Sequence, residues 1–191
     1  KTGYVKSDEE RQYIDDYFKK HISKFDEKKF GFRERYWFYN ANLWRSFLVQ
    51  DFLACYKYSH KWVTLFYDNE NMIFLNPVFF LKGNHYLLES LFMLKYKSNF
   101  KRYLALLEET ISDDRFPVND NIASLSFLYL YNNKLNYHIL EGTFAEAEYL
   151  IPEVLDKIKL HNEHLDEHHE MVFYYKIACM YFGNEKHNEC V

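Results

Sequence analysis

Glycine and proline, the residues that most often interrupt regular structure, are scarce in this chain. Its 191 residues include five Gly and three Pro, beside 18 Tyr, 18 Phe and three Trp. A fold with many tight turns needs more turn-forming residues, so we expect long elements joined by short connections, which favours helices over a many-stranded sandwich. Hydrophobic residues make up 48% of the chain and charged residues 27%. Length and composition together indicate one domain with a substantial core.

Apolar residues recur at helical spacing, and no segment has the alternation that is typical of a strand. The sequence therefore predicts an all-α fold, with helices over about 8–24, 33–57, 76–97, 120–140, 144–158 and 168–182, and with Ser59 and Ser98 as the N-caps of two more. Gly142 is expected to end one helix, and Thr143 and Glu146 to form the capping box of the next. Pro152 should kink or split that helix near Glu148, because proline lacks a backbone donor.

A helix, a tight turn and a second helix recur along the chain. The best-matched units contain Tyr174, Ile177, Ala178, Tyr181, Phe182, Gly183, His187 and Cys190, and Tyr131, Leu135, His138, Gly142, Phe144 and Ala147. Weaker copies contain Leu87, Leu91, Leu94, Asn99, Phe100 and Tyr103, and Val49, Leu53, Tyr56, Trp62 and Leu65. This pattern resembles the tetratricopeptide repeat, whose period is about 34 residues. With Trp62, Phe100, Phe144 and His187 as the turn aromatics, the spacings here are 38, 44 and 43 residues, so the units are longer.

The resemblance implies a right-handed α-α superhelix, an α-solenoid of tetratricopeptide-like hairpins that form one continuous domain. Residues 1–44 do not match the repeat and are expected to form N-terminal helices that cap the array. Residues 45–191 would form about four hairpins, the last of them incomplete because Cys190 lies only one turn into a second helix. We therefore expect either a piece of a longer array or a last helix that pairs with something else, self-association included.

The resemblance also implies a function without chemistry: a protein- or peptide-binding scaffold, or the sensing part of a larger regulatory protein, that binds through a concave groove. The groove residues expected on the first helices of the hairpins are Gln50, Lys57, His85, Glu89, Lys95, Tyr129, Asn132, Asn136 and Tyr175. Asn132 and Asn136 are four residues apart and could hydrogen-bond a peptide backbone in both directions. The Lys-plus-Asn pattern with which some members of the family hold a C-terminal carboxylate is not reproduced in the first two units.

A cluster of histidines between residues 161 and 169 suggests a different class of function. If this stretch is helical, His161, His164 and His168 share one face at a spacing that can hold Zn²⁺, and the stretch from His164 to His168 fits the H-x-x-E-H pattern of inverted zinc proteases. A solvated polar connection between repeats explains the same residues, and we favour it. The alternative function is a metal-dependent hydrolase. A third is a DNA-binding regulator whose basic helix lies outside this chain.

Charge and cysteine content narrow the range of partners and compartments. The net charge is −4, which provides no overall basic field for nucleic acid or anionic lipid. No apolar run approaches the roughly 20 residues of a membrane span. The three cysteines, Cys55, Cys179 and Cys190, are an odd number and indicate reduced thiols in the cytoplasm. No glycine-rich phosphate loop is present, so we expect no cofactor.

Overall fold

The computed structural model describes residues 5–190, and these residues form an all-α fold without strands. The helices are α1 (Asp8–His21), α2 (Phe32–Leu48), α3 (Phe52–Tyr67), α4 (Asn71–Leu75), α5 (Pro77–Met93), α6 (Lys97–Ile111), α7 (Asp120–Glu141), α8 (Phe144–Ala147), α9 (Ile151–Leu160) and α10 (Glu167–Gly183). Short 3₁₀ turns lie at Glu27–Lys29, Glu148–Leu150 and His187–Cys190. Within the described range, no helix combines the length and apolar character needed to cross a membrane.

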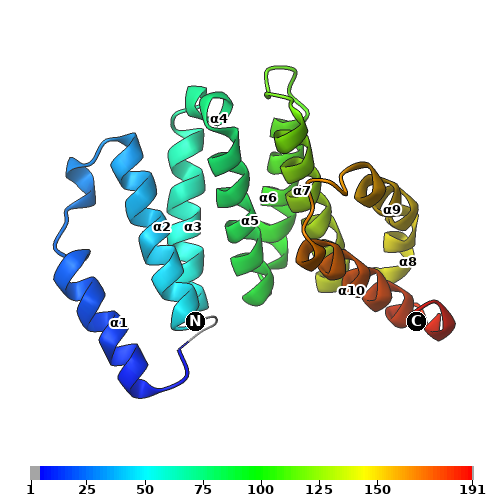
Figure 1. Cartoon of the computed structure of the whole chain (residues 1–191), viewed down its shortest axis with the longest axis horizontal. Helices are drawn as coiled ribbons and strands as arrows, with labels where there is room; N and C mark the ends of the chain where they lie inside the picture. The colour runs from blue at the N-terminus through cyan, green and yellow to red at the C-terminus, as the bar shows by residue number, and fades with distance from the viewer. Residues whose placement is uncertain (1–4, 191) are drawn as a thin grey trace.

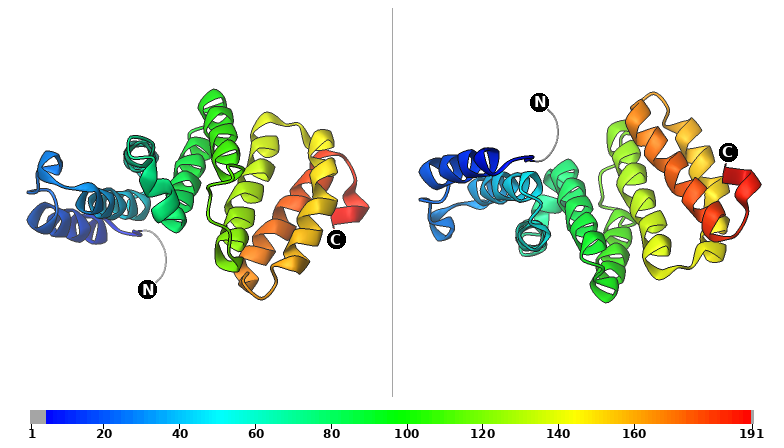
Figure 2. Two further views of the ribbon diagram at one scale, coloured as in Figure 1. Left: turned by 90° about the horizontal axis from the view of Figure 1, so that it is seen from above. Right: turned by 90° about the horizontal axis from the view of Figure 1, so that it is seen from below.

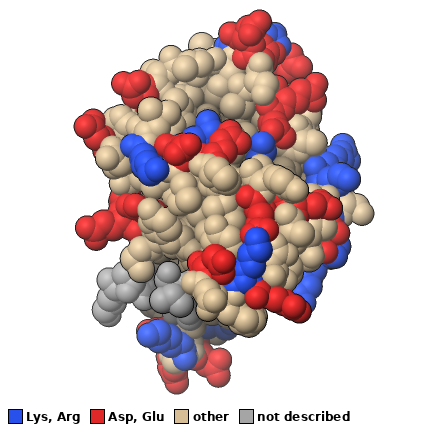
Figure 3. All heavy atoms as spheres, turned by 90° about the vertical axis from the view of Figure 1, so that its right-hand side faces the viewer, with Lys and Arg blue, Asp and Glu red and all other residues tan. Residues whose placement is uncertain are grey.

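The helices follow one another along the long axis of the molecule in chain order (Figures 1 and 2). Helix α3 packs against α2 and α5, and α7 packs against α5, α6 and α10. A single hydrophobic core extends through these contacts from Tyr36 to Met180. The surface at the α10 end carries acidic and basic side chains together (Figure 3). Stacking in chain order accords with an array of helical hairpins, whereas a right-handed superhelical path stays a prediction.

The same left-handed turn ends α2, α5, α7 and α10. In each turn one residue has a positive φ: Gln50 (56°), Lys95 (57°), Gly142 (75°) and Glu185 (61°). The next residue donates its N–H to the carbonyl five positions back, from Asp51 to Ser46, Tyr96 to Leu91, Thr143 to His138 and Lys186 to Tyr181, at 2.9–3.1 Å. This bond defines the Schellman motif of helix C-termini. The turns are spaced by 45, 47 and 43 residues, which accords with the expected array of hairpins.

The first of these turns lies at Gln50, earlier in the chain than the turn that the sequence predicted near Trp62. The helix expected over 33–57 is wrong, because a turn at residues 49–51 separates α2 from α3 and the Asp51 side chain caps α3 by accepting from the N–H of Ala54 at 3.0 Å. Ser59 is not an N-cap: it is buried within α3, and its hydroxyl donates to the carbonyl of Cys55 at 2.7 Å. Trp62 therefore lies in the middle of a helix and not at a turn.

The sequence also predicted helix boundaries at proline and glycine residues, and the structure confirms them. Helix α5 begins at Pro77, α7 ends at Gly142, and the turn Glu148–Leu150 splits α8 from α9 just before Pro152. The capping box is wrong, since the Thr143 hydroxyl lies 2.8 Å from Nδ1 of His138 instead of capping α8. Ser98 is also not a cap: α5 ends at Met93, and α6 begins at Lys97, one residue before Ser98.

The two ends of the expected array also differ from the sequence-based division. The boundary between residues 44 and 45 falls inside α2, so that helix belongs to the first hairpin. After α10 the chain forms the 3₁₀ turn His187–Cys190 in place of the start of an α-helix. Helix α10 leaves Met171, Tyr174 and Phe182 exposed. Self-association through this face stays a prediction.

Candidate binding cleft

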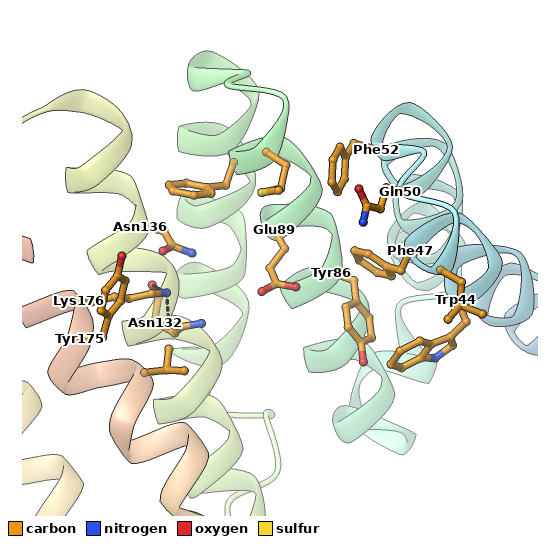
Figure 4. Close-up of a pocket in the computed structure, with 14 residues that line it drawn as sticks. Trp44, Phe47, Gln50, Phe52, Tyr86, Glu89, Asn132, Asn136, Tyr175 and Lys176 are labelled. Atoms are coloured by element: carbon orange, nitrogen blue, oxygen red, sulfur yellow. Dashed lines mark hydrogen bonds between the residues drawn. The ribbon is translucent and has the colours of Figure 1, made fainter. Parts of the chain in front are cut away.

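A cleft of about 900 Å³ opens on the described part of the chain (Figure 4). It lies between the helices that end in the left-handed turns, α2, α5, α7 and α10, and Gln50 of the turn after α2 and Phe52 at the start of α3 also line it. Its lining residues are Trp44, Phe47, Leu48, Gln50, Phe52, Tyr86, Glu89, Phe92, Met93, Asn132, Asn136, Val172, Tyr175 and Lys176. Four helices that end in the same kind of turn thus surround one cavity.

One side of the cleft is aromatic. Trp44 and Phe47 of α2 lie against Tyr86 of α5, with ring centroids 5.9 Å and 5.7 Å from that of Tyr86. These residues share one face of α2 because they are three positions apart. The Trp44 side chain is 51% exposed, although no other residue type buries as much apolar area. Exposed aromatic side chains around a cavity are typical of a surface that binds a partner.

The opposite side of the cleft is polar. The ammonium of Lys176 on α10 donates to the carbonyl oxygen of Asn132 at 3.4 Å and to Oδ1 of the same residue (Figure 4). Burial lowers the pKa of Lys176 to about 8, against the attraction of Glu89 for the charged form. The two bonds from Lys176 fix α10 to α7 at the edge of the cleft.

Glu89 lies between the two sides. The carboxylate is 3.8 Å from Nε2 of His85, one turn earlier on α5. His85 stacks on Tyr129, with ring centroids 4.6 Å apart, and burial lowers its pKa below the ordinary value of 6.5, so the imidazole is neutral at pH 7. A smaller cavity of about 130 Å³, lined in part by His85, Glu89, Tyr129 and Asn132, adjoins the main cleft.

The structure brings most of the expected groove residues together. Gln50, Glu89, Asn132, Asn136 and Tyr175 line the cleft, and His85 and Tyr129 line the smaller cavity beside it. The two remaining lysines lie elsewhere. Lys57 is on the exposed face of α3, and Lys95 is in the exposed turn after α5.

The two amides expected to bond a peptide are both largely buried, and Asn132 is partly engaged within the protein. The Asn132 and Asn136 side chains are 7% and 5% exposed, because α5 and α10 both cover α7. Asn132 already binds Lys176, whereas the Asn136 amide forms no hydrogen bond within residues 5–190 and borders the cleft. Binding of a peptide backbone by these amides stays a prediction, and the Asn136 amide is the less engaged of the two.

Trp44, Phe47, Tyr86 and Lys176 are lining residues that sequence reasoning missed. The aromatic pair on α2 lies around the boundary at which the repeat was expected to begin, so its face was never assigned to the groove. For Lys176 a signal existed, since it follows the buried Phe173 by three residues and so shares its face of α10.

The histidine cluster does not form the expected helical face. Helix α9 ends at Leu160 and α10 begins at Glu167, so His161 and His164 lie in the connection between them. Nδ1 of His161 is 3.0 Å from the Ser124 hydroxyl, and its ring stacks on Phe127 at 5.4 Å. Across the described residues, no group of three or more His, Cys, Asp or Glu side chains is placed to hold a metal ion.

The lowered pKa of Lys176 predicts a pH-dependent stability. Between about 8 and the ordinary value of 10.5, the unfolded chain binds a proton that the folded chain has released. The contribution of Lys176 to the free energy of unfolding therefore rises with pH through this window. We expect the difference in this free energy between the wild type and Lys176→Met to move in favour of the wild type from pH 7.5 to 9.5 in urea titrations. The matched change Lys101→Met, at an exposed position of α6, should give a constant difference, and a constant difference for Lys176→Met would contradict the prediction.

Comparisons with known proteins do not assign this chain to a family. No protein-family model, no curated protein and no solved structure matches the chain. The resemblance to the tetratricopeptide repeat therefore stays a prediction, and the function has to be argued from the geometry of the cleft.

Proposed function

We propose that this chain is a non-catalytic binding domain that holds a peptide or an extended protein segment in the cleft between α2, α5, α7 and α10. The observation that carries the proposal is the cleft itself, a cavity of about 900 Å³ to which four helices contribute aromatic side chains and amides. Its volume is within the range of ligand-binding pockets in general. Its walls come from segments more than 120 residues apart in sequence, from Trp44 to Lys176.

Physical chemistry favours a polypeptide ligand at such a site. Large aromatic side chains bury much apolar area with little loss of conformational entropy, and they dominate the binding energy of protein interfaces. Trp44 and Tyr175 are exposed on opposite sides of the cleft, so one extended segment can contact both. The Asn136 amide offers a donor and an acceptor to a peptide backbone.

The repeated hairpins support a wider proposal about the whole protein. A right-handed tetratricopeptide-like superhelix would place the helices that line the cleft on its concave side, which is where such arrays bind partners. The role that follows is that of a scaffold, or of the sensing domain of a larger regulatory protein. The free cysteines, with Cys55 buried, support a cytoplasmic location.

Matched aromatic substitutions test the proposed cleft. Peptides are selected from a random library on the immobilised protein, and their affinities are measured by fluorescence anisotropy. We expect Trp44→Ala to weaken binding about tenfold or more, as the loss of an interface anchor does. Trp37→Ala is the control, because Trp37 lies on the same helix, is 56% exposed and is outside the cleft.

A second matched pair checks the other side of the cleft. Tyr175→Ala should weaken the same peptides, whereas Tyr174→Ala should not, because Tyr174 is exposed on α10 but does not line the cleft. Circular dichroism would establish that all four variants keep the helical fold. Equal effects within each pair, or no peptide whose binding depends on Trp44, would contradict the proposed function.

A further inference from the structure

The carboxylate of Glu89 lies in a largely apolar cleft and forms no direct ion pair with a lysine or arginine of residues 5–190. Its side chain is 41% exposed, and within residues 5–190 no N–H or O–H group donates to it. The nearest basic group is Nε2 of His85 at 3.8 Å, and burial lowers the pKa of that imidazole, so it carries no charge at pH 7. A carboxylate of this kind stays accessible from the cleft and lacks a direct counterion, so it can pair with a cation supplied from outside.

Lys176 attracts this carboxylate from a distance but does not pair with it. Its ammonium is held by the carbonyl and Oδ1 of Asn132, and no ion pair within the described residues joins it to Glu89. Figure 4 shows Glu89 pointing into the open space between the amides of α7 and the aromatic side chains of α2. The cleft therefore has a fixed cation at the α10 edge and, nearer its centre, an anion that forms no direct ion pair with that cation.

The surroundings of Glu89 are suited to a cation that is also partly apolar. Tyr86 precedes Glu89 by three residues on the same helix face, and Phe47 and Trp44 lie beyond Tyr86. Aromatic faces attract cations through their quadrupole, more strongly where water is excluded. A guanidinium group fits these features better than an ammonium, because it is planar, weakly hydrated, stacks on aromatic rings and binds a carboxylate with two parallel hydrogen bonds.

We propose that the cleft recognises an arginine side chain within an apolar segment, with Glu89 as the anionic anchor and with Tyr86, Phe47 and Trp44 as the aromatic wall. This inference rests on the proposed function and adds the chemistry of the ligand. The apolar neighbours of the arginine would lie against Phe52, Phe92 and Met93, which line the same cleft next to Gln50. The segment's backbone can bond the free amide of Asn136.

The test begins with two parallel selections. One random-peptide library is selected on the wild type and, separately, on Glu89→Gln, which keeps the shape of the side chain and removes its charge. We expect peptides from the wild type to be enriched in arginine flanked by bulky apolar residues, and peptides from Glu89→Gln to lack that enrichment. The control is Glu109→Gln, at an exposed glutamate of α6 outside the cleft, which should return the wild-type preference.

The strongest selected peptide is then synthesised with arginine and with citrulline, its uncharged analogue of equal shape. We expect citrulline to weaken binding to the wild type about tenfold or more, and to change binding to Glu89→Gln by about twofold or less, because the lost interaction is a charged hydrogen-bonded pair. Equal affinity of the two peptides for the wild type would overturn the inference.

The possible outcomes separate the inference from the proposed function. Selected peptides that depend on Trp44 but carry no basic residue would overturn the arginine site and leave the binding cleft intact. Enrichment of acidic residues or of free C-terminal carboxylates would indicate that Lys176 is the anchor, and would also overturn it. A failure to select any peptide that depends on Trp44 would overturn both.

Discussion

Replacing Trp62 with alanine is expected to lower the free energy of unfolding by about 3–5 kcal/mol, the usual cost of removing a buried aromatic side chain. Trp62 is 1% exposed, and its ring lies 4.9 Å from that of Tyr36 on α2 and 6.1 Å from that of Tyr86 on α5. A Cβ atom at Gly83 of α5 would lie 2.9 Å from the indole, so the two helices meet closely here. Urea denaturation followed by circular dichroism measures the effect.

Two controls distinguish a core role from a turn role for Trp62. Trp62→Phe should cost less than Trp62→Ala, because it keeps an aromatic ring in the site and removes Nε1, a buried donor that has no hydrogen-bond partner in the described structure. Trp37→Ala should change stability little, since Trp37 is exposed. A loss for Trp62→Ala no larger than that for Trp37→Ala would mean that α2, α3 and α5 do not share this core.

Trp62 was expected at a turn but lies inside α3, and the reason shows which helix boundaries can be predicted from sequence. Pro77, Gly142 and Pro152 mark true helix boundaries because their backbone preferences hold in any fold. The turns at Gln50 and Lys95 adopt the same left-handed geometry as Gly142 without a glycine. Neither residue type marks such a turn in a sequence, so the predicted start of the first unit lies about one helix too late.

The candidate site follows the same division between local and tertiary information. Glu89, Asn136 and Tyr175 could be assigned to the cleft because each lies on a helix face that the hairpin pattern already indicates. The bond between Lys176 and Asn132 depends on how α10 crosses α7, which no local pattern encodes. The histidine cluster allowed two interpretations from sequence, a shared helical face and a polar connection, and His161 and His164 lie in a connection whereas His168 lies in α10.

Replacing Phe173 with alanine is expected to lower the free energy of unfolding by about 3–5 kcal/mol as well. Phe173 is fully buried, and its ring stacks on Phe127 of α7 with centroids 4.9 Å apart and planes 12° apart. Only Ile177 and Met180 are buried beside it on α10, so this one side chain supplies a large share of the helix's attachment. Thermal and urea unfolding of Phe173→Ala would measure the loss.

The matched control is Phe182→Ala, on the same helix but 68% exposed, which should change stability by less than about 1 kcal/mol. Because α10 also carries Val172, Tyr175 and Lys176 into the cleft, weakening its attachment should reduce peptide affinity under conditions where the protein remains folded. The two effects should appear together, since the contact that fixes α10 to α7 also forms one wall of the cleft. A loss of stability without a loss of peptide affinity would show that ligand binding does not require α10. The binding site would then consist of the α2 and α5 side of the cleft alone.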